Sequence, residues 1–141
     1  MQTFFRDLSE DEQGDVLTAL EIRFPGRAAS DLWRKFQCDQ AVALIMRDLH
    51  GAIAVISFYE LNRASSGDLE FFIRGAMNLQ PSLHATEKAF PQYDQYARFF
   101  KCQSMAFQTE RAGLVRKVES MPGWTLDAVL RDGQFLMRKV L

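Results

Sequence analysis

The chain has 141 residues, close to the commonest size of a single globular domain. Apolar residues make up 48% and charged residues 25% of it, so the composition excludes a disordered tail, a collagen-like fibre and a pure coiled coil. The formal net charge is −1, which gives no electrostatic reason to expect binding to nucleic acid or to an anionic membrane.

Three features of the sequence predict a cytoplasmic protein. No apolar run approaches the roughly 18–20 residues that span a bilayer, so no membrane partner is expected. The first seven residues lack the basic start and apolar block of a signal peptide. Cys38 and Cys102 lie 64 positions apart, and in a chain able to bury a core this favours two reduced, buried thiols.

The charges are unevenly distributed along the chain. Residues 1–95 carry 9 basic and 14 acidic side chains, and residues 96–141 carry 8 basic and 4 acidic ones. Two oppositely charged, solvated faces within one fold explain this pattern. A partner surface or the entrance of a site for an anionic ligand is the alternative.

The N-terminal quarter predicts helical structure after a short apolar stretch at residues 4–5. Ser9 and Glu12 have the spacing of a capping box, in which the serine oxygen accepts from a backbone amide and the glutamate reaches back to the serine amide. A helix is therefore expected from Ser9 to about Phe24, ended by Pro25-Gly26.

A second helix and three strands are expected next. Ser30 or Asp31 is predicted to cap a short helix that carries Leu32, Trp33 and Phe36. Residues 41–47, 53–59 and 69–74 are apolar on both faces or rich in β-branched and aromatic side chains. This predicts three central strands in an antiparallel meander.

A helix is predicted after a connection at residues 75–80. Pro81 suits the first turn of a helix, and Pro91 is expected to interrupt or split it. Aromatic residues then repeat at helical spacing, which favours a buried stripe, with ligand stacking as the alternative. They are Tyr93, Tyr96, Phe99 and Phe100.

The last forty residues predict a strand, a helix and a hairpin. The strand covers residues 104–108, and the helix opens at 109–111 with Leu114, Val118 and Met121 on one face. Residues 124–130 alternate as a strand with one apolar face, and 131–134 have the Asp-Gly signature of a type I′ turn. Residues 135–141 form the partner strand.

This order of elements resembles the GNAT superfamily of acyl-CoA-dependent N-acyltransferases. The likeness is most specific over residues 103–141, where a strand, a helix, the pair Gly123-Trp124 and a hairpin ending in Lys139-Val140-Leu141 follow one another. It implies one α+β domain over residues 1–141 with a mixed central sheet. The Asp-Gly-Gln-Phe hairpin is also similar to GNAT-like proteins of tailed phages, some of which are virion or assembly components.

The resemblance implies how such a fold binds its cofactor. Two parallel strands, here 69–74 and 103–109, part at one end, and the pantetheine arm of acetyl-CoA or another acyl-CoA pairs with their backbone. The pyrophosphate binds the amides at the start of the next helix, here residues 82–84, where the helix dipole favours anions. The acceptor amine approaches from the other side.

The resemblance also assigns site residues. Glu70 is the candidate general base, and a solvated carboxylate or an ion pair with Arg74 is the structural alternative. The residues expected to bind the cofactor are Arg74, Gly75, Ser82, Leu83, His84, Phe107 and Arg111.

The sequence departs from the family pattern at two places. The phosphate loop of the family has a second glycine that is missing after Arg74-Gly75, and Pro81 removes one amide. The position of the family's general-acid tyrosine holds Glu119, or Val118 if Pro122 is an insertion.

These departures leave two functions open. The first is a divergent acyltransferase that uses acyl-CoA and an amine acceptor. The second is an inactive GNAT-fold module that binds a protein partner or forms a homo-oligomer, and that is virion-associated if it is of phage origin.

Other chemistries find less support. His50 and His84 lack the spacing of metal ligands, so no metal is expected. A buried structural role is expected for Cys102 rather than a nucleophilic one. Six basic side chains are either a solvated rim or a phosphate-binding surface suited to the 3′-phosphate of CoA. They are Arg111, Arg116, Lys117, Arg131, Arg138 and Lys139.

Overall fold

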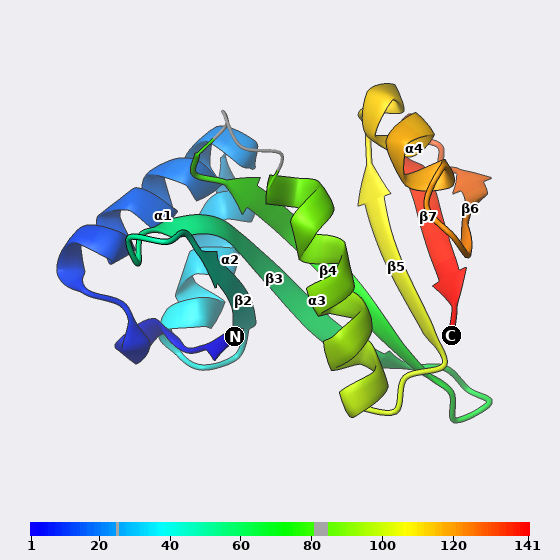
Figure 1. The fold of residues 1–141 in the computed structure, drawn as a ribbon, viewed down its shortest axis with the longest axis horizontal. Coiled ribbons are helices and arrows are strands. Elements are labelled where there is room, and N and C mark those ends of the chain that lie inside the picture. The colour runs from blue at the N-terminus through cyan, green and yellow to red at the C-terminus, as the bar shows by residue number, and fades with distance from the viewer. Residues whose placement is uncertain (25, 81–84) are drawn as a thin grey trace. The chain divides into compact units, whose positions relative to one another are not determined.

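The computed structural model describes residues 1–24, 26–80 and 85–141, and Figure 1 shows its elements. The predicted order of strands and helices is confirmed, with one short 3₁₀ helix added. The elements are β1 (Gln2–Thr3), η1 (Phe5–Asp7), α1 (Glu10–Arg23), α2 (Arg27–Gln37), β2 (Val42–Arg47), β3 (Ile53–Arg63), β4 (Leu69–Asn78), α3 (Ala85–Phe99), β5 (Ser104–Thr109), α4 (Ala112–Glu119), β6 (Trp124–Val129) and β7 (Phe135–Val140).

The strands form one mixed sheet in the order β1-β2-β3-β4-β5-β7-β6. β4 and β5 pair in parallel, whereas β1–β2, β2–β3, β5–β7 and β6–β7 pair antiparallel. The expected α+β class with a mixed central sheet is confirmed.

The parallel pairing between β4 and β5 covers only part of both strands. It joins Glu70–Ile73 to Ser104–Phe107, whereas β4 continues to Asn78 and β5 to Thr109. On its other side β5 pairs with β7 along its whole length. The prediction that the two parallel strands lose their mutual pairing toward one end is confirmed for the described residues.

The chain divides into two compact units, each built from two segments. Unit 1 comprises Met1–Tyr59 and Gly75–Phe90, and unit 2 comprises Glu60–Arg74 and Pro91–Leu141. The expectation of a single domain stays a prediction.

The first helix of unit 1 begins with the predicted capping box. The amide of Glu12 donates to Ser9 Oγ at 3.2 Å, and the amide of Ser9 donates to Glu12 Oε1 at 3.1 Å. The helix ends at Arg23, with Phe24 as its C-cap, and Pro25 lies outside the described residues.

The second helix begins earlier than predicted. Its N-cap is Gly26, with a φ of 74°, so Ser30 and Asp31 lie inside the helix and the predicted cap is wrong. A positive φ is accessible to glycine at little cost, so the chain turns directly into α2 at this point.

An aromatic cluster anchors α2 on the sheet of unit 1. Phe36 is fully buried, and its ring lies 5.1 Å from that of Phe58 on β3 and 5.9 Å from that of Phe5. The surrounding core contains Leu8, Val16, Leu20, Ala29, Ala43, Ile45, Ile53, Ile56 and Met77.

Two strands are longer than expected. β3 runs on to Arg63 and β4 to Asn78, so the predicted connection at 75–80 is mostly strand. The end of β3 is polar and exposed, which hides the strand pattern in the sequence.

The predicted break of α3 at Pro91 is wrong, because the helix continues through it. Proline removes one backbone donor without forcing the helix to end. The aromatic stripe is only partly buried. Tyr93 is 2% exposed, whereas Phe99 is 73% exposed. The predicted helical start at Pro81 lies outside the described residues.

In unit 2, α4 starts at Ala112 rather than at Thr109. Thr109 is the last residue of β5, and its Oγ1 accepts a hydrogen bond from the amide of Arg111 at 3.1 Å. The buried face of α4 is formed by Val115 and Val118.

The hairpin of β6 and β7 differs from its prediction in two ways. The register shifts between Leu126 and Ala128, so Asp127 is the extra residue of a β-bulge. Trp124 is buried, but Leu126, which the register keeps on the same face, is 39% exposed, so the predicted apolar face is wrong at Leu126. In the turn, among the described residues, only Gly133 has a positive φ, so the turn is not type I′.

Candidate functional site

Two neighbouring residues of β7 point to opposite faces of the sheet in unit 2. Lys139 Nζ donates to Asp94 Oδ1 at 2.8 Å, so the Lys139 face is the one on which α3 lies. Successive side chains of a strand point to opposite faces of the sheet. Arg138 therefore points to the other face, where its Nε donates to Glu70 Oε2 at 2.9 Å.

Glu70, the predicted general base, belongs to a cluster of four polar residues. Its Oε2 also accepts from Ser104 Oγ at 3.1 Å, and Arg138 Nη1 donates to Asp127 Oδ2. The Glu70 side chain is 21% exposed and that of Arg138 is 32% exposed. We call Glu70, Ser104, Asp127 and Arg138 the Glu70 cluster; all four lie in unit 2.

The cluster holds two carboxylates and one guanidinium. The hydrogen bond that Arg138 donates to Glu70, together with the negative charges of Glu70 and Asp127, raises the pKa of Arg138 above its usual value. Burial raises the pKa of the nearby Cys102 thiol, and the charge of Glu70 adds to this effect. Because the thiolate is the reactive form, Cys102 is not suited to nucleophilic chemistry.

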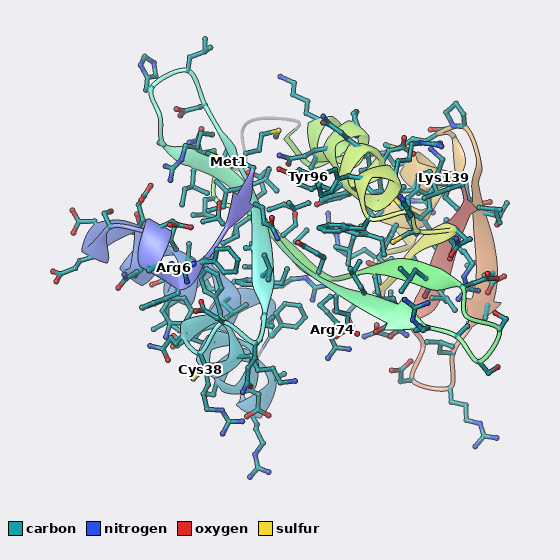
Figure 2. All side chains as sticks on the ribbon, turned by 90° about the horizontal axis from the view of Figure 1, so that it is seen from below. Met1, Arg6, Cys38, Arg74, Tyr96 and Lys139 are labelled. Atoms are coloured by element: carbon teal, nitrogen blue, oxygen red, sulfur yellow. The ribbon has the colours of Figure 1, made fainter. Side chains whose placement is uncertain are left out.

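Arg74 is not the ion-pair partner of Glu70 that the sequence suggested as an alternative. Its side chain is 53% exposed, projects from β4 (Figure 2), and lies 3.8 Å from Glu60 Oε1. Glu70 is paired with Arg138 instead, because the register of β5 and β7 brings Arg138 within reach of β4.

Gly75 has a packing reason to be glycine. A Cβ atom built on it would lie 2.4 Å from Cζ and 2.6 Å from Cε2 of Phe24, both within unit 1. This contact explains the residue without a ligand. A role of Gly75 in cofactor binding stays a prediction.

The remaining predicted cofactor residues lie apart in unit 2 or outside the described residues. Phe107 is buried, its ring lies 5.4 Å from that of Trp124, and it pairs with Met137, which places it on the sheet face opposite to Glu70. Arg111 is the exposed N-cap residue of α4. Ser82, Leu83 and His84 lie outside the described residues.

Neither residue at the position of the family's tyrosine replaces its chemistry. Glu119 is the exposed last residue of α4, and Val118 is buried and apolar. Tyr93 and Tyr96 lie on α3.

Two members of the predicted basic surface are bound to carboxylates. Arg138 pairs with Glu70 and Asp127, and Lys139 pairs with Asp94. The other four basic residues, Arg111, Arg116, Lys117 and Arg131, are exposed.

Cys38 is exposed at the end of α2 (Figure 2), so the expectation that both thiols are buried is wrong for it. In the part of the chain that the structure describes, no group of three His, Cys, Asp or Glu side chains is arranged to hold a metal ion. Within the same residues, no helix combines the length and apolarity needed to cross a membrane.

Sequence reasoning missed the roles of Ser104, Asp127 and Arg138 around Glu70. The strand alternation that separates Arg138 from Lys139 is visible in the sequence. The bulge at Asp127 and the parallel register of β4 on β5 leave no such mark, because both depend on pairing between distant segments.

Comparison with known proteins identifies the fold. No protein-family model matches the sequence, and no curated protein matches it. Among solved structures, the chain is similar to a component of the NatC complex bound to Gag peptide and CoA, with a TM-score of 0.74, 9% identity and coverage of 100% of this chain and 98% of that one.

Two further structures give the same result. Naa50 of Arabidopsis thaliana, in complex with the bisubstrate analogue CoA-Ac-MVNAL, has a TM-score of 0.71 and 7% identity over 100% of this chain and 98% of that one. A GNAT-family acetyltransferase of Listeria monocytogenes has a TM-score of 0.69 and 8% identity over 100% and 94%. The chain therefore has the GNAT acetyltransferase fold. Nothing in these likenesses bears on the predicted resemblance to phage proteins.

Proposed function

We propose that this chain, which has the GNAT acetyltransferase fold, is an N-acyltransferase that uses acetyl-CoA or another acyl-CoA and an amine acceptor. The observation that carries the proposal is the register of β5. Its last two residues, Gln108 and Thr109, pair with β7 on one side, while its pairing with β4 ends at Phe107. A strand edge with unpaired amides and carbonyls is what an extended ligand can bind by adding to the sheet.

The residues present fit a pantetheine arm at this strand edge, because recognition there needs backbone groups only. The sequence gives less support for binding the pyrophosphate of the cofactor, since the second glycine of the family's phosphate loop is absent. We propose the amides of residues 82–84 for that end, with Arg74, Gly75, Phe107 and Arg111 as further binding residues. The similar structures that hold CoA or a CoA analogue support this choice of cofactor.

We propose Glu70 as the proton acceptor for the amine. The acyl-CoA supplies an acyl group activated as a thioester, and transfer forms a C–N bond while the C–S bond breaks and CoA leaves as a thiolate. The second proton, released by the nitrogen after attack, neutralises that thiolate. An ammonium group must first lose a proton for its nitrogen to attack. Glu70 Oε2 accepts two hydrogen bonds, whereas no bond among the described residues ends on Oε1. Oε1 is therefore the atom we assign to take the proton.

Thermal unfolding with and without millimolar acetyl-CoA tests the cofactor. A ligand at 100 times its Kd stabilises a protein by about 2.7 kcal/mol, which is several degrees in Tm for a domain of this size. ATP is the matched control, because it shares the adenine and the phosphates but lacks the pantetheine arm. We expect a shift with acetyl-CoA that ATP does not reproduce.

Acyl transfer to a panel of amines, followed by mass spectrometry, tests the reaction. Glu70→Gln is expected to keep the acetyl-CoA shift and to lose transfer by about 100-fold or more. Absence of an acetyl-CoA shift in the intact chain refutes the enzyme. The inactive binding module is then the second candidate, supported by the packing role of Gly75, and light scattering should show an oligomer or a bound partner.

A further inference from the structure

Arg138 reaches across the sheet to a strand that is not its neighbour. In the strand order, β5 lies between β4, which carries Glu70, and β7, which carries Arg138. The residue of β5 that pairs directly with Arg138 is Ala106, which is fully buried. A methyl group at this position leaves room for the guanidinium to pass over β5 and bind Glu70.

The guanidinium is held by two different nitrogens. Its Nε donates to Glu70 and its Nη1 donates to Asp127. The donors of arginine form a rigid planar fork, so two anchors on different edges fix the orientation of the whole group. Lysine, with one small ammonium on a flexible chain, has no such fork.

The second anchor lies at a backbone irregularity. Asp127 is the extra residue between the pairs Leu126↔Met137 and Ala128↔Leu136. β-bulges locally disrupt the ladder and are used to re-aim a side chain. Thr125 pairs with Arg138, so strand alternation puts Asp127, two residues further on, on the same sheet face, where its carboxylate contacts Arg138.

We propose that Arg138 is a positioning residue that holds the Glu70 carboxylate in one orientation, and that Asp127 is the anchor that keeps Arg138 in place. With Oε2 bound to Arg138 and Ser104, Oε1 is left to face the acceptor amine. This inference rests on the proposed function for its catalytic consequence, but the positioning itself is a property of the chain alone.

The unit provides a matched control on the opposite face. Asp94 is paired with Lys139 and Arg98, just as Asp127 is paired with Arg138. Lys139 directly follows Arg138 on β7, so the two pairs lie on neighbouring positions of one strand. Asp94→Asn thus removes the same charge from a two-cation bridge without touching the Glu70 cluster. Both substitutions keep the size of the side chain, and melting temperatures verify that each variant folds.

The first measurement is hydrogen exchange of the Arg138 Nε–H by NMR, which needs no activity. We expect slow exchange in the intact chain, an increase of about tenfold or more in Asp127→Asn, and no change in Asp94→Asn. Equal exchange in the intact chain and in Asp127→Asn overturns the proposal. If the intact chain transfers no acyl group, the proposed function fails, and this measurement alone decides whether Asp127 anchors Arg138.

The second measurement separates kcat from KM. Misplacing a reacting group by about 1 Å costs up to roughly 100-fold in rate, so Arg138→Met and Arg138→Lys should lower kcat by about 10- to 100-fold and leave the KM for acyl-CoA unchanged. Asp127→Asn should lower kcat by a smaller factor in the same way. If the ion pair only stabilised the fold, removing it would lower the melting temperature and leave kcat unchanged. That result contradicts the proposal, as does an equal loss of kcat in Asp94→Asn.

Discussion

Replacing Gly75 by alanine distinguishes a packing role of this glycine from a role in cofactor binding. Its φ lies outside the left-handed region, so the backbone itself accepts alanine. The new Cβ would lie 2.4 Å and 2.6 Å from two ring carbons of Phe24, where ordinary contacts begin at 3.4 Å. The ring must therefore move by about 1 Å.

The expected cost follows from the surroundings of the ring. Phe24 is packed against the core of unit 1, so its displacement disturbs neighbouring side chains. Overpacking of this kind costs about 1–3 kcal/mol. Alanine gains about 0.5–1 kcal/mol over glycine inside a strand because the unfolded chain loses less freedom. We expect Gly75→Ala to be destabilised by about 1–2 kcal/mol overall.

Urea denaturation of a double-mutant cycle measures this contact. Phe24→Leu removes the far end of the ring, so Gly75→Ala should cost little or nothing in that background. Gly113→Ala in α4 is the control, because the nearest atom to its new Cβ is Arg116 Nη2 at 3.9 Å, and it should stabilise by about 0.5–1 kcal/mol. Equal stability of Gly75→Ala and the intact chain, combined with a lost acetyl-CoA shift, would refute the packing argument in favour of the cofactor role.

Three further outcomes are expected. Ser9→Ala should destabilise by about 1 kcal/mol in urea, since it removes the N-cap of α1, and an unchanged midpoint would show that the capping box contributes nothing. The hydrogen bond from Arg47 lowers the pKa of Glu12 in the folded chain. The ionised Glu12 therefore contributes its full stability above the ordinary pKa of 4.5, and this contribution is lost as the pH falls through the lowered folded pKa. Arg47→Met should make the free energy of unfolding fall less steeply between about pH 5 and pH 3, and an equally steep fall contradicts this. A thiol reagent should modify the exposed Cys38 at once and the buried Cys102, whose pKa is raised by burial, only slowly until urea unfolds the chain, so two fast thiols would count against the structure.

Local signals in the sequence predicted the order of elements correctly because each acts over a few residues. The capping box of Ser9 and Glu12 involves side chains three positions apart, and it is present as expected. One local prediction is wrong for a local reason: Pro91 was expected to break α3, but a helix can lose one hydrogen bond and continue. The other errors arose where a second segment decides the outcome.

The β6 strand illustrates the same limit in the sheet. Its alternating apolar residues predicted one buried face, but Leu126, on the same face as the buried Trp124, is 39% exposed, and a bulge follows at Asp127. A bulge is set by pairing with β7, and the sequence of β6 alone does not contain it.

The family resemblance indicates Glu70, whereas its partners follow from registers that join four strands. Parallel pairing sets Glu70 beside Ser104, antiparallel pairing sets Ala106 beside Arg138, and the pairing of Thr125 with Arg138 puts Asp127 on the same face. A shift of one residue in any of these pairings would move the side chains of the shifted strand to the opposite face, and the Glu70 cluster would not form. The long-range pairing of the sheet thus determines which groups hold the Glu70 carboxylate, and the proton-accepting role that we propose needs both that pairing and the carboxylate of residue 70.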